Sequence, residues 1–79
     1  MYAYIVWCHE KGVLSVCGDY YKAEEVAQNL EWSLRMWDDI VVSALYIYKV
    51  AKNKKIELRA DTSWCIYQNG VWELDSEEL

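Results

Sequence analysis

The fold is decided by Asp19 to Asp39, DYYKAEEVAQNLEWSLRMWDD, the only stretch of this chain with a sustained helical period. At about 100° per residue, one broad arc collects most of its apolar side chains. The residues of this arc are Tyr20, Ala23, Val26, Ala27, Leu30, Ser33, Leu34 and Trp37. The carboxylate of Asp19 can accept the free N–H groups of the first turn. The stretch therefore predicts one amphipathic helix that packs on a sheet.

The opposite arc of this helix carries large apolar side chains among carboxylates. The outward residues are Tyr21, Glu25, Gln28, Trp32, Met36 and Asp39, flanked by Glu24, Glu31 and Arg35. A row of exposed apolar residues indicates a contact surface, and Trp, Tyr and Met are enriched in interface cores. Packing under a loop or against a second copy would explain the same residues. We expect partner contacts from Tyr21, Glu24, Glu25, Glu31, Trp32, Met36 and Asp39.

The remainder of the chain has the β-branched and aromatic composition of strands. The predicted strands are 2–9 and 13–17 before the helix, and 40–50, 56–60, 63–68 and 71–75 after it. Asn69-Gly70 is a strong signal for a two-residue hairpin. The order ββαββββ predicts an α+β fold, an antiparallel sheet with one amphipathic helix packed on one face. We expect one compact domain over 1–79, with 76–79 as a frayed acidic tail.

The predicted core combines the apolar arc of the helix with inward strand positions. Its members are Ile5, Trp7, Leu14, Val16, Val26, Leu30, Leu34, Trp37, Leu45, Ile47, Ile56, Leu58, Tyr67 and Trp72. Several strands are apolar on both faces, whereas a single helix covers only one face of a sheet. The uncovered face is therefore a second candidate contact surface, and a homodimer is expected from it.

Composition narrows the classes of partner. The chain has 79 residues, of which 54% are hydrophobic, and its formal net charge is −5. Such a charge argues against direct binding of nucleic acid, which requires neutralisation of phosphates. Five of the eight basic residues lie within the segment 49–59 and predict a basic hairpin tip, best explained as a solubilising turn. MYAYIVWCHE at the start favours neither a signal peptide nor a membrane span, so we expect a cytoplasmic protein.

Residues that could carry catalysis or hold a metal do not form a recognisable pattern. Cys8, Cys17 and Cys65 match no metal-ligand spacing, and we interpret them as reduced thiols. His9 has no obvious orienting carboxylate, so we expect a turn histidine rather than a general base. The sequence predicts a protein that is not an enzyme and has no metal and no cofactor.

The carboxylates of Glu24, Glu31 and Asp38 repeat every seven residues along one flank of the helix. This spacing suits either a solvated helix flank or a row of charge that resembles a nucleic-acid backbone.

The build of the whole chain, with its closing aromatic hairpin SWCIYQNGVWELD, resembles the small phage-encoded inhibitors of bacterial defence, the anti-CRISPR-like proteins. This resemblance covers size, acidity and architecture, and it assigns no functional residue. It implies a stoichiometric binder that blocks a nucleic-acid-handling complex by masking a basic surface or locking a conformation.

Three hypotheses follow for the function. The leading one is a non-enzymatic, protein-binding inhibitor encoded by a phage or mobile element. The alternative is a self-associating structural or adaptor module, a homodimer with no inhibitory role. A third, a small-ligand-binding or cysteine-based redox protein, depends on the three thiols alone.

Overall fold

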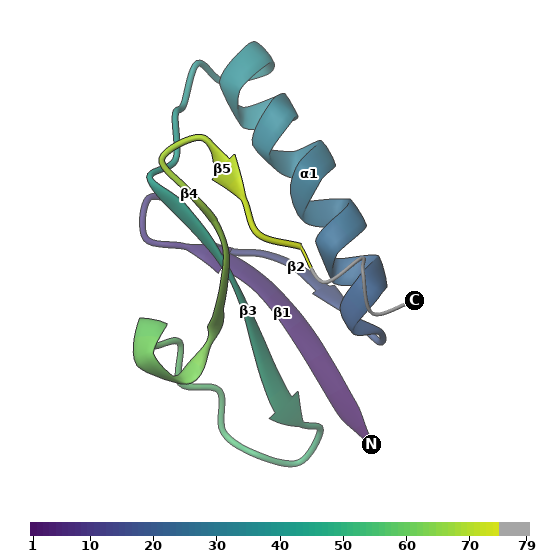
Figure 1. Cartoon of the computed structure of the whole chain (residues 1–79). Coiled ribbons are helices and arrows are strands. Elements are labelled where there is room, and N and C mark those ends of the chain that lie inside the picture. Colours follow the sequence, from purple (N-terminus) through teal and green to yellow (C-terminus); the bar gives the residue numbers. More distant parts are fainter. Residues whose placement is uncertain (75–79) are drawn as a thin grey trace.

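The computed structural model describes residues 1–74, and the predicted tail at 76–79 lies outside them. One helix packs against a five-stranded antiparallel sheet (Figure 1). The elements are β1 (Tyr2–Cys8), β2 (Gly12–Cys17), α1 (Tyr20–Trp37), β3 (Ala44–Ala51), a short 3-10 helix (Ala60–Thr62), β4 (Trp64–Gln68) and β5 (Val71–Trp72). The predicted α+β fold is confirmed.

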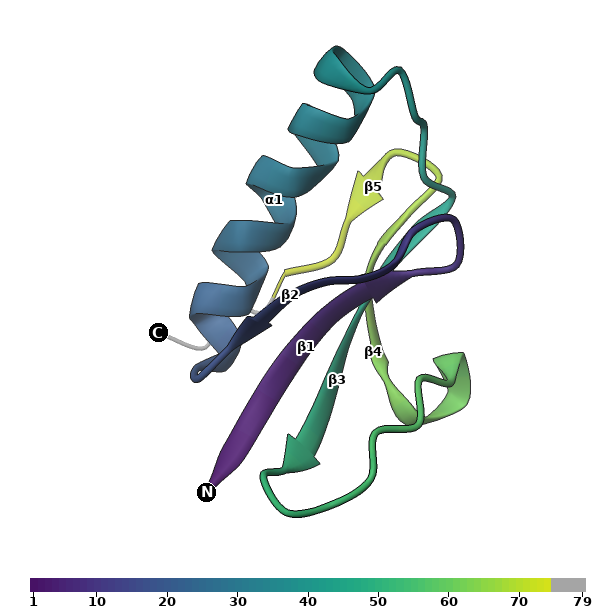
Figure 2. The same ribbon diagram turned by 180° about the vertical axis from the view of Figure 1, so that it is seen from behind.

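The strands are ordered β2-β1-β3-β4-β5 across the sheet, and every neighbouring pair is antiparallel. Because β2 and β3 both pair with β1, they run parallel to each other. Helix α1 connects them by crossing one face of the sheet, as Figures 1 and 2 show from opposite sides. This crossover fixes which side of the helix meets the sheet and which side is left outward.

Two local signals in the sequence are confirmed. Asp19 caps the helix, because its Oδ2 accepts the Lys22 N–H at 3.0 Å. Asn69 and Gly70 form the β4–β5 turn with φ of 49° and 89°, which explains why this position needs Asn-Gly.

The strand predicted at 56–60 does not form. The 3-10 helix Ala60–Thr62 begins at the end of this range, and Ile56 is exposed. A strand needs a free sheet edge, and the edge of β3 away from β1 is already occupied by β4. The strand predicted at 40–50 is shorter than expected, since β3 begins only at Ala44.

The face of the sheet away from α1 is partly covered, contrary to expectation. Ile5, Trp7 and Val50 form a small buried cluster there, and Leu58 packs against it. The indole N–H of Trp7 donates to Ser63 Oγ at 3.1 Å. The segment between β3 and β4 therefore acts as a cover for the middle of this face, in place of the predicted extra strand.

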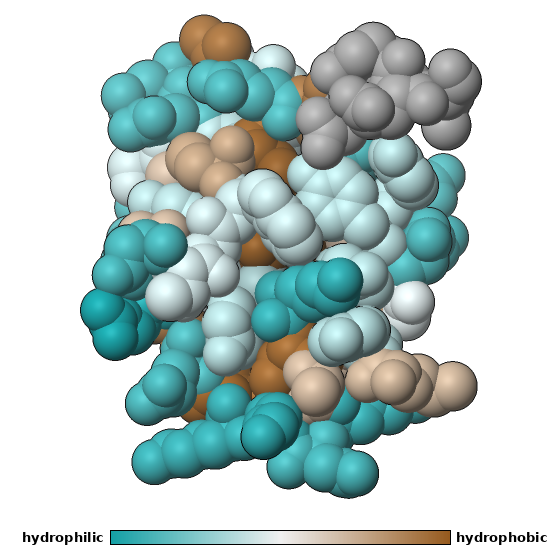
Figure 3. Space-filling view, turned by 60° about the horizontal axis from the view of Figure 1, so that its bottom comes forward, coloured by the Kyte–Doolittle hydropathy of each residue, from teal (hydrophilic) through white to brown (hydrophobic). Residues whose placement is uncertain are grey.

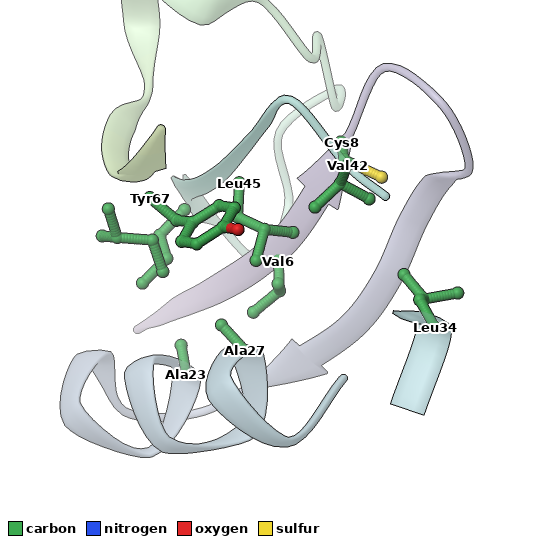
Figure 4. Close-up of a cluster of buried hydrophobic side chains, with 10 residues drawn as sticks. Val6, Cys8, Ala23, Ala27, Leu34, Val42, Leu45 and Tyr67 are labelled. Carbon is green, nitrogen blue, oxygen red and sulfur yellow. The ribbon is translucent and has the colours of Figure 1, made fainter. Parts of the chain in front are cut away.

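The main core lies between α1 and the sheet (Figure 4). Its buried residues are Val6, Cys8, Ala23, Ala27, Leu34, Val42, Leu45, Ile47, Ile66 and Tyr67. Figure 4 shows Ala23 and Ala27 pointing from the helix toward Val6 on β1. Of the predicted core, Ile5, Trp7, Leu34, Leu45, Ile47 and Tyr67 are buried, and Leu14, Val26, Leu30, Leu58 and Trp72 are half-buried.

Val16, Trp37 and Ile56 were predicted to be buried and are exposed. Val16 lies on β2 at the edge of the sheet, and Ile56 lies in the covering segment. Trp37 ends a helix whose C-terminal end stands beyond the strands in both ribbon views. Each of these side chains is placed where no second layer lies over it in the described chain, 1–74.

Candidate protein-binding surface

The inner side of α1 differs from the predicted arc. Ala23 and Ala27 are fully buried, and the flanking carboxylates Glu24 and Glu31 are only 5% and 6% exposed. Relative to the predicted arc, the buried side is rotated by roughly 60° about the helix axis, at about 100° per residue. The two alanines explain this orientation, because small side chains let a helix approach a sheet closely. Glu24 and Glu31 are therefore removed from the predicted contact surface.

Glu31 is held by an ion pair inside the helix. Its Oε2 accepts the Arg35 Nε–H at 3.0 Å and its Oε1 accepts from Arg35 Nη2 at 3.5 Å. The side chain of Arg35 remains about half exposed and covers the carboxylate from the solvent side. The pKa of Arg35 is raised above its ordinary value, first by this hydrogen bond and then by the charge of Glu31.

The burial of Glu24 and Glu31 also removes the predicted row of charge. Of the three carboxylates spaced by seven residues, only Asp38 is exposed. A row that resembles a nucleic-acid backbone must present its charges to solvent. This flank of α1 does not do so.

The outward side of the helix is exposed where the sequence predicts it. Tyr21, Trp32 and Met36 are all among the exposed large apolar residues of the chain. Glu25 is exposed as well and forms a solvated ion pair with Lys22, Nζ to Oε1 3.2 Å. These four predicted contact residues lie along one side of α1.

Trp37 is the residue of this surface that the sequence analysis missed. It is 76% exposed, and its indole meets that of Trp32 edge to face, with ring centroids 6.2 Å apart and planes at 75°. The rings contact each other rather than the core. Trp37 lies in the last turn of a helix that extends past the end of the strands, and this position is the signal that would have identified it as exposed. We call Tyr21, Glu25, Trp32, Met36, Trp37 and Asp39 the outer surface.

The end of the helix presents Asp39 in an unusual conformation. The Asp38 N–H closes the last turn on the Leu34 carbonyl at 3.1 Å, and the Ile40 N–H reaches the same carbonyl at 2.8 Å. Between them, Asp39 has φ of 58°, a left-handed conformation in which Gly is favoured and Asp is tolerated. The chain therefore keeps an exposed carboxylate next to the tryptophans where glycine would be less strained.

Other chemistry in the chain is sparse. Within residues 1–74, His, Cys, Asp and Glu form no group of three that could hold a metal ion. Cys8 is buried, Cys17 half-buried and Cys65 exposed, and all three are free thiols. No helix in the described part of the chain is long and apolar enough to cross a membrane.

One face of the molecule mixes apolar and polar side chains. In Figure 3, brown apolar side chains are separated by pale aromatic and teal polar ones. Lys49 and Tyr2 form one contact of this mixed kind, because the Lys49 ammonium lies 4.3 Å from the centre of the Tyr2 ring. Surfaces of this mixed kind are ordinary for a folded domain, whereas neighbouring exposed tryptophans are not.

Comparison of the chain with protein-family models, with curated proteins and with solved structures finds no match.

Proposed function

We propose that this protein is a non-enzymatic, protein-binding inhibitor whose contact surface is the outer surface of α1. The observation that carries the proposal is the exposed Trp32–Trp37 pair, with Met36 beside it in sequence. Trp residues dominate the binding energy of many interfaces, and they are costly to leave in water without a function. The twin indoles would enter an apolar pocket of the partner.

The charges around this pair indicate the chemistry of the partner. Asp38 and Asp39 follow the tryptophans directly, Glu25 lies on the same side of the helix, and the formal net charge of the chain is −5. An acidic rim around apolar anchors favours a partner with a basic surface and adds salt-sensitive attraction. Nucleic-acid-handling complexes carry such surfaces, so we propose that the chain masks one or locks its conformation.

The resemblance to anti-CRISPR-like proteins makes this proposal specific. We propose a phage or mobile-element protein that inhibits a defence complex such as CRISPR–Cas in stoichiometric amounts. The test is DNA cleavage by purified CRISPR–Cas nucleases of several types, titrated with the pure chain. We expect one of them to stop at a ratio close to one inhibitor per complex. Full cleavage by every complex would overturn the anti-defence assignment.

Matched variants test the surface separately from the target. Trp32→Ala and Trp37→Ala each should weaken inhibition by about 30-fold, since a central aromatic contributes about 2 kcal/mol or more. Ile56→Ala is the control, because Ile56 is also an exposed large apolar residue and lies in the segment between β3 and β4. If the tryptophan variants inhibit as well as the parent, the outer surface is not the surface that contacts the target.

A further inference from the structure

The two edges of the sheet are protected to different degrees. At one edge, β5 has only two residues, Val71 and Trp72, and a short edge strand offers little to pair with. At the other edge, β2 has six residues, Gly12–Cys17. Within residues 1–74, β2 pairs with β1 alone. Alternate N–H and C=O groups of β2 therefore point away from the sheet, as on any edge strand.

The sequence of β2 lacks the usual protection against pairing with another strand. GVLSVC contains no charged residue and no proline, whereas exposed edges commonly carry lysine or proline for this purpose. One protective device is present: a shift in register between Val6 and Trp7 leaves Leu14 as an extra residue on β2. It disturbs the first half of the strand, and Ser15–Cys17 continue in regular register with β1.

Exposed apolar side chains accompany this edge. Val13 pairs with Trp7 and Val16 with Ile5, so both valines lie on the face away from α1, next to that buried pair. Trp7 and Ile5 are covered, whereas the valines are at least half exposed. Val16 is 62% exposed and extends the small cluster of this face toward the edge. A strand laid along β2 would continue the apolar surface.

The charges at the ends of β2 specify the occupant. Lys11 precedes the strand, Asp19 follows it, and both are exposed. When two copies of this strand run antiparallel, the Lys11 end of each lies beside the Asp19 end of the other. A strand with an uncharged middle and opposite charges at its ends is therefore complementary to itself.

We propose that two copies of this chain associate through antiparallel pairing of their β2 strands about Ser15, the register that sets Lys11 of each copy opposite Asp19 of the other. The twofold arrangement joins the two sheets edge to edge and brings the exposed valines of both copies together. The regular pairing is short, so the interface is small and the dissociation constant falls in the micromolar range or above. The inference does not rest on the proposed function, because the outer surface of α1 takes no part in it.

The test is sedimentation velocity of the full chain from low-micromolar to near-millimolar concentration. We expect a reversible monomer–dimer equilibrium. Val16→Lys should raise the dissociation constant at least tenfold, because a charge is placed on the edge. Val71→Lys is the matched control, since Val71 is 60% exposed on the opposite edge strand, and it should leave the equilibrium unchanged. Lys11→Glu should weaken association severalfold by removing the complementary end charge.

Hydrogen exchange of the unmodified chain gives a second measurement that does not depend on any variant folding. The amides of Ser15–Cys17 should become more protected as concentration rises, and those of β5 should not. A chain that stays monomeric at near-millimolar concentration would overturn the proposal. So would a dimer that Val16→Lys leaves intact, or one whose concentration-dependent protection falls outside β2.

Discussion

Each side of α1 carries residues of the kind usually found on the other side of an amphipathic helix. The inner side buries the carboxylates of Glu24 and Glu31 beside two alanines, while the outer side leaves Trp32 and Trp37 in contact with solvent. A buried Glu is rare unless it is paired. A large aromatic side chain left in water does not gain the free energy of burial. The difference teaches that the inner side is arranged for a close helix–sheet approach, whereas folding alone gives no reason for the outer side.

The largest expected effect is a change in the free energy of unfolding, which should differ between a variant on the inner side of α1 and one on the outer side. Leu34 is buried in the main core and Met36, two residues on, is exposed. Leu34→Ala should lower the free energy of unfolding by about 2–3 kcal/mol through lost burial and a residual cavity. Met36→Ala should change it by less than about 0.5 kcal/mol, as surface substitutions generally do. Urea denaturation followed by tryptophan fluorescence measures both, and similar losses in the two variants would contradict this assignment of sides.

The next effect compares two glutamates, one from each side. Glu31→Gln removes the charge from a buried carboxylate that accepts two hydrogen bonds from Arg35, and we expect a loss of about 1 kcal/mol. Glu25→Gln removes the charge from a solvated pair with Lys22, which contributes little. The measurement is the denaturation midpoint in low and high salt. A larger loss for the Glu25 variant would mean that the exposed pair, not the buried one, stabilises the helix.

The outer row of Tyr21, Trp32 and Met36 could be predicted from periodicity, because these residues lie opposite the inward apolar arc on the helical wheel. The burial of Glu24 and Glu31 and the exposure of Trp37 could not be predicted in this way. A broad apolar arc leaves the rotation of the helix undetermined by some tens of degrees. The choice is made by the depth at which Ala23 and Ala27 meet the sheet and by where the sheet ends.

The strands show the same limit. Asn69-Gly70 encodes its hairpin locally, since both residues adopt the positive φ that the turn requires. The alternation in residues 56–60 is equally regular, yet no strand forms, because β4 already occupies the edge of β3. Local pattern predicts which segments can be strands, and competition for edges decides which of them are.

Asp39 tests whether the outer side is maintained at the expense of stability. At φ of 58°, Asp39→Gly relieves a left-handed conformation, and we expect a gain of up to about 1 kcal/mol in the free energy of unfolding. The same change deletes an exposed carboxylate next to Trp37, so binding to a basic partner should weaken. Calorimetric melting measures the first effect and the cleavage titration the second. A variant that is less stable than the parent would show that the aspartate itself stabilises the helix end.

The smallest expected effect concerns a third carboxylate, Glu10, which is solvated like Glu25 but tied to the backbone. The Ser43 N–H donates to its Oε2 at 3.1 Å and the Ser43 hydroxyl at 2.9 Å. Mainly through the backbone donor, the pKa of Glu10 is lowered from its ordinary 4.5. Its contribution to stability is therefore complete above about pH 4.5 and is lost as the pH falls through the lower, folded-state pKa.

Solvent screening limits this contribution to a few tenths of a kcal/mol. Glu10→Gln should be less stable than the parent at neutral pH and should converge with it in acid, because protonation then removes the same charge from the parent. Glu25→Gln serves as the control for loss of an exposed carboxylate, because Glu25 forms a solvated ion pair with Lys22. Urea denaturation at several pH values between neutral and strongly acidic measures the difference. A constant gap between Glu10→Gln and the parent at every pH would assign the effect of Glu10 to packing rather than to its charge.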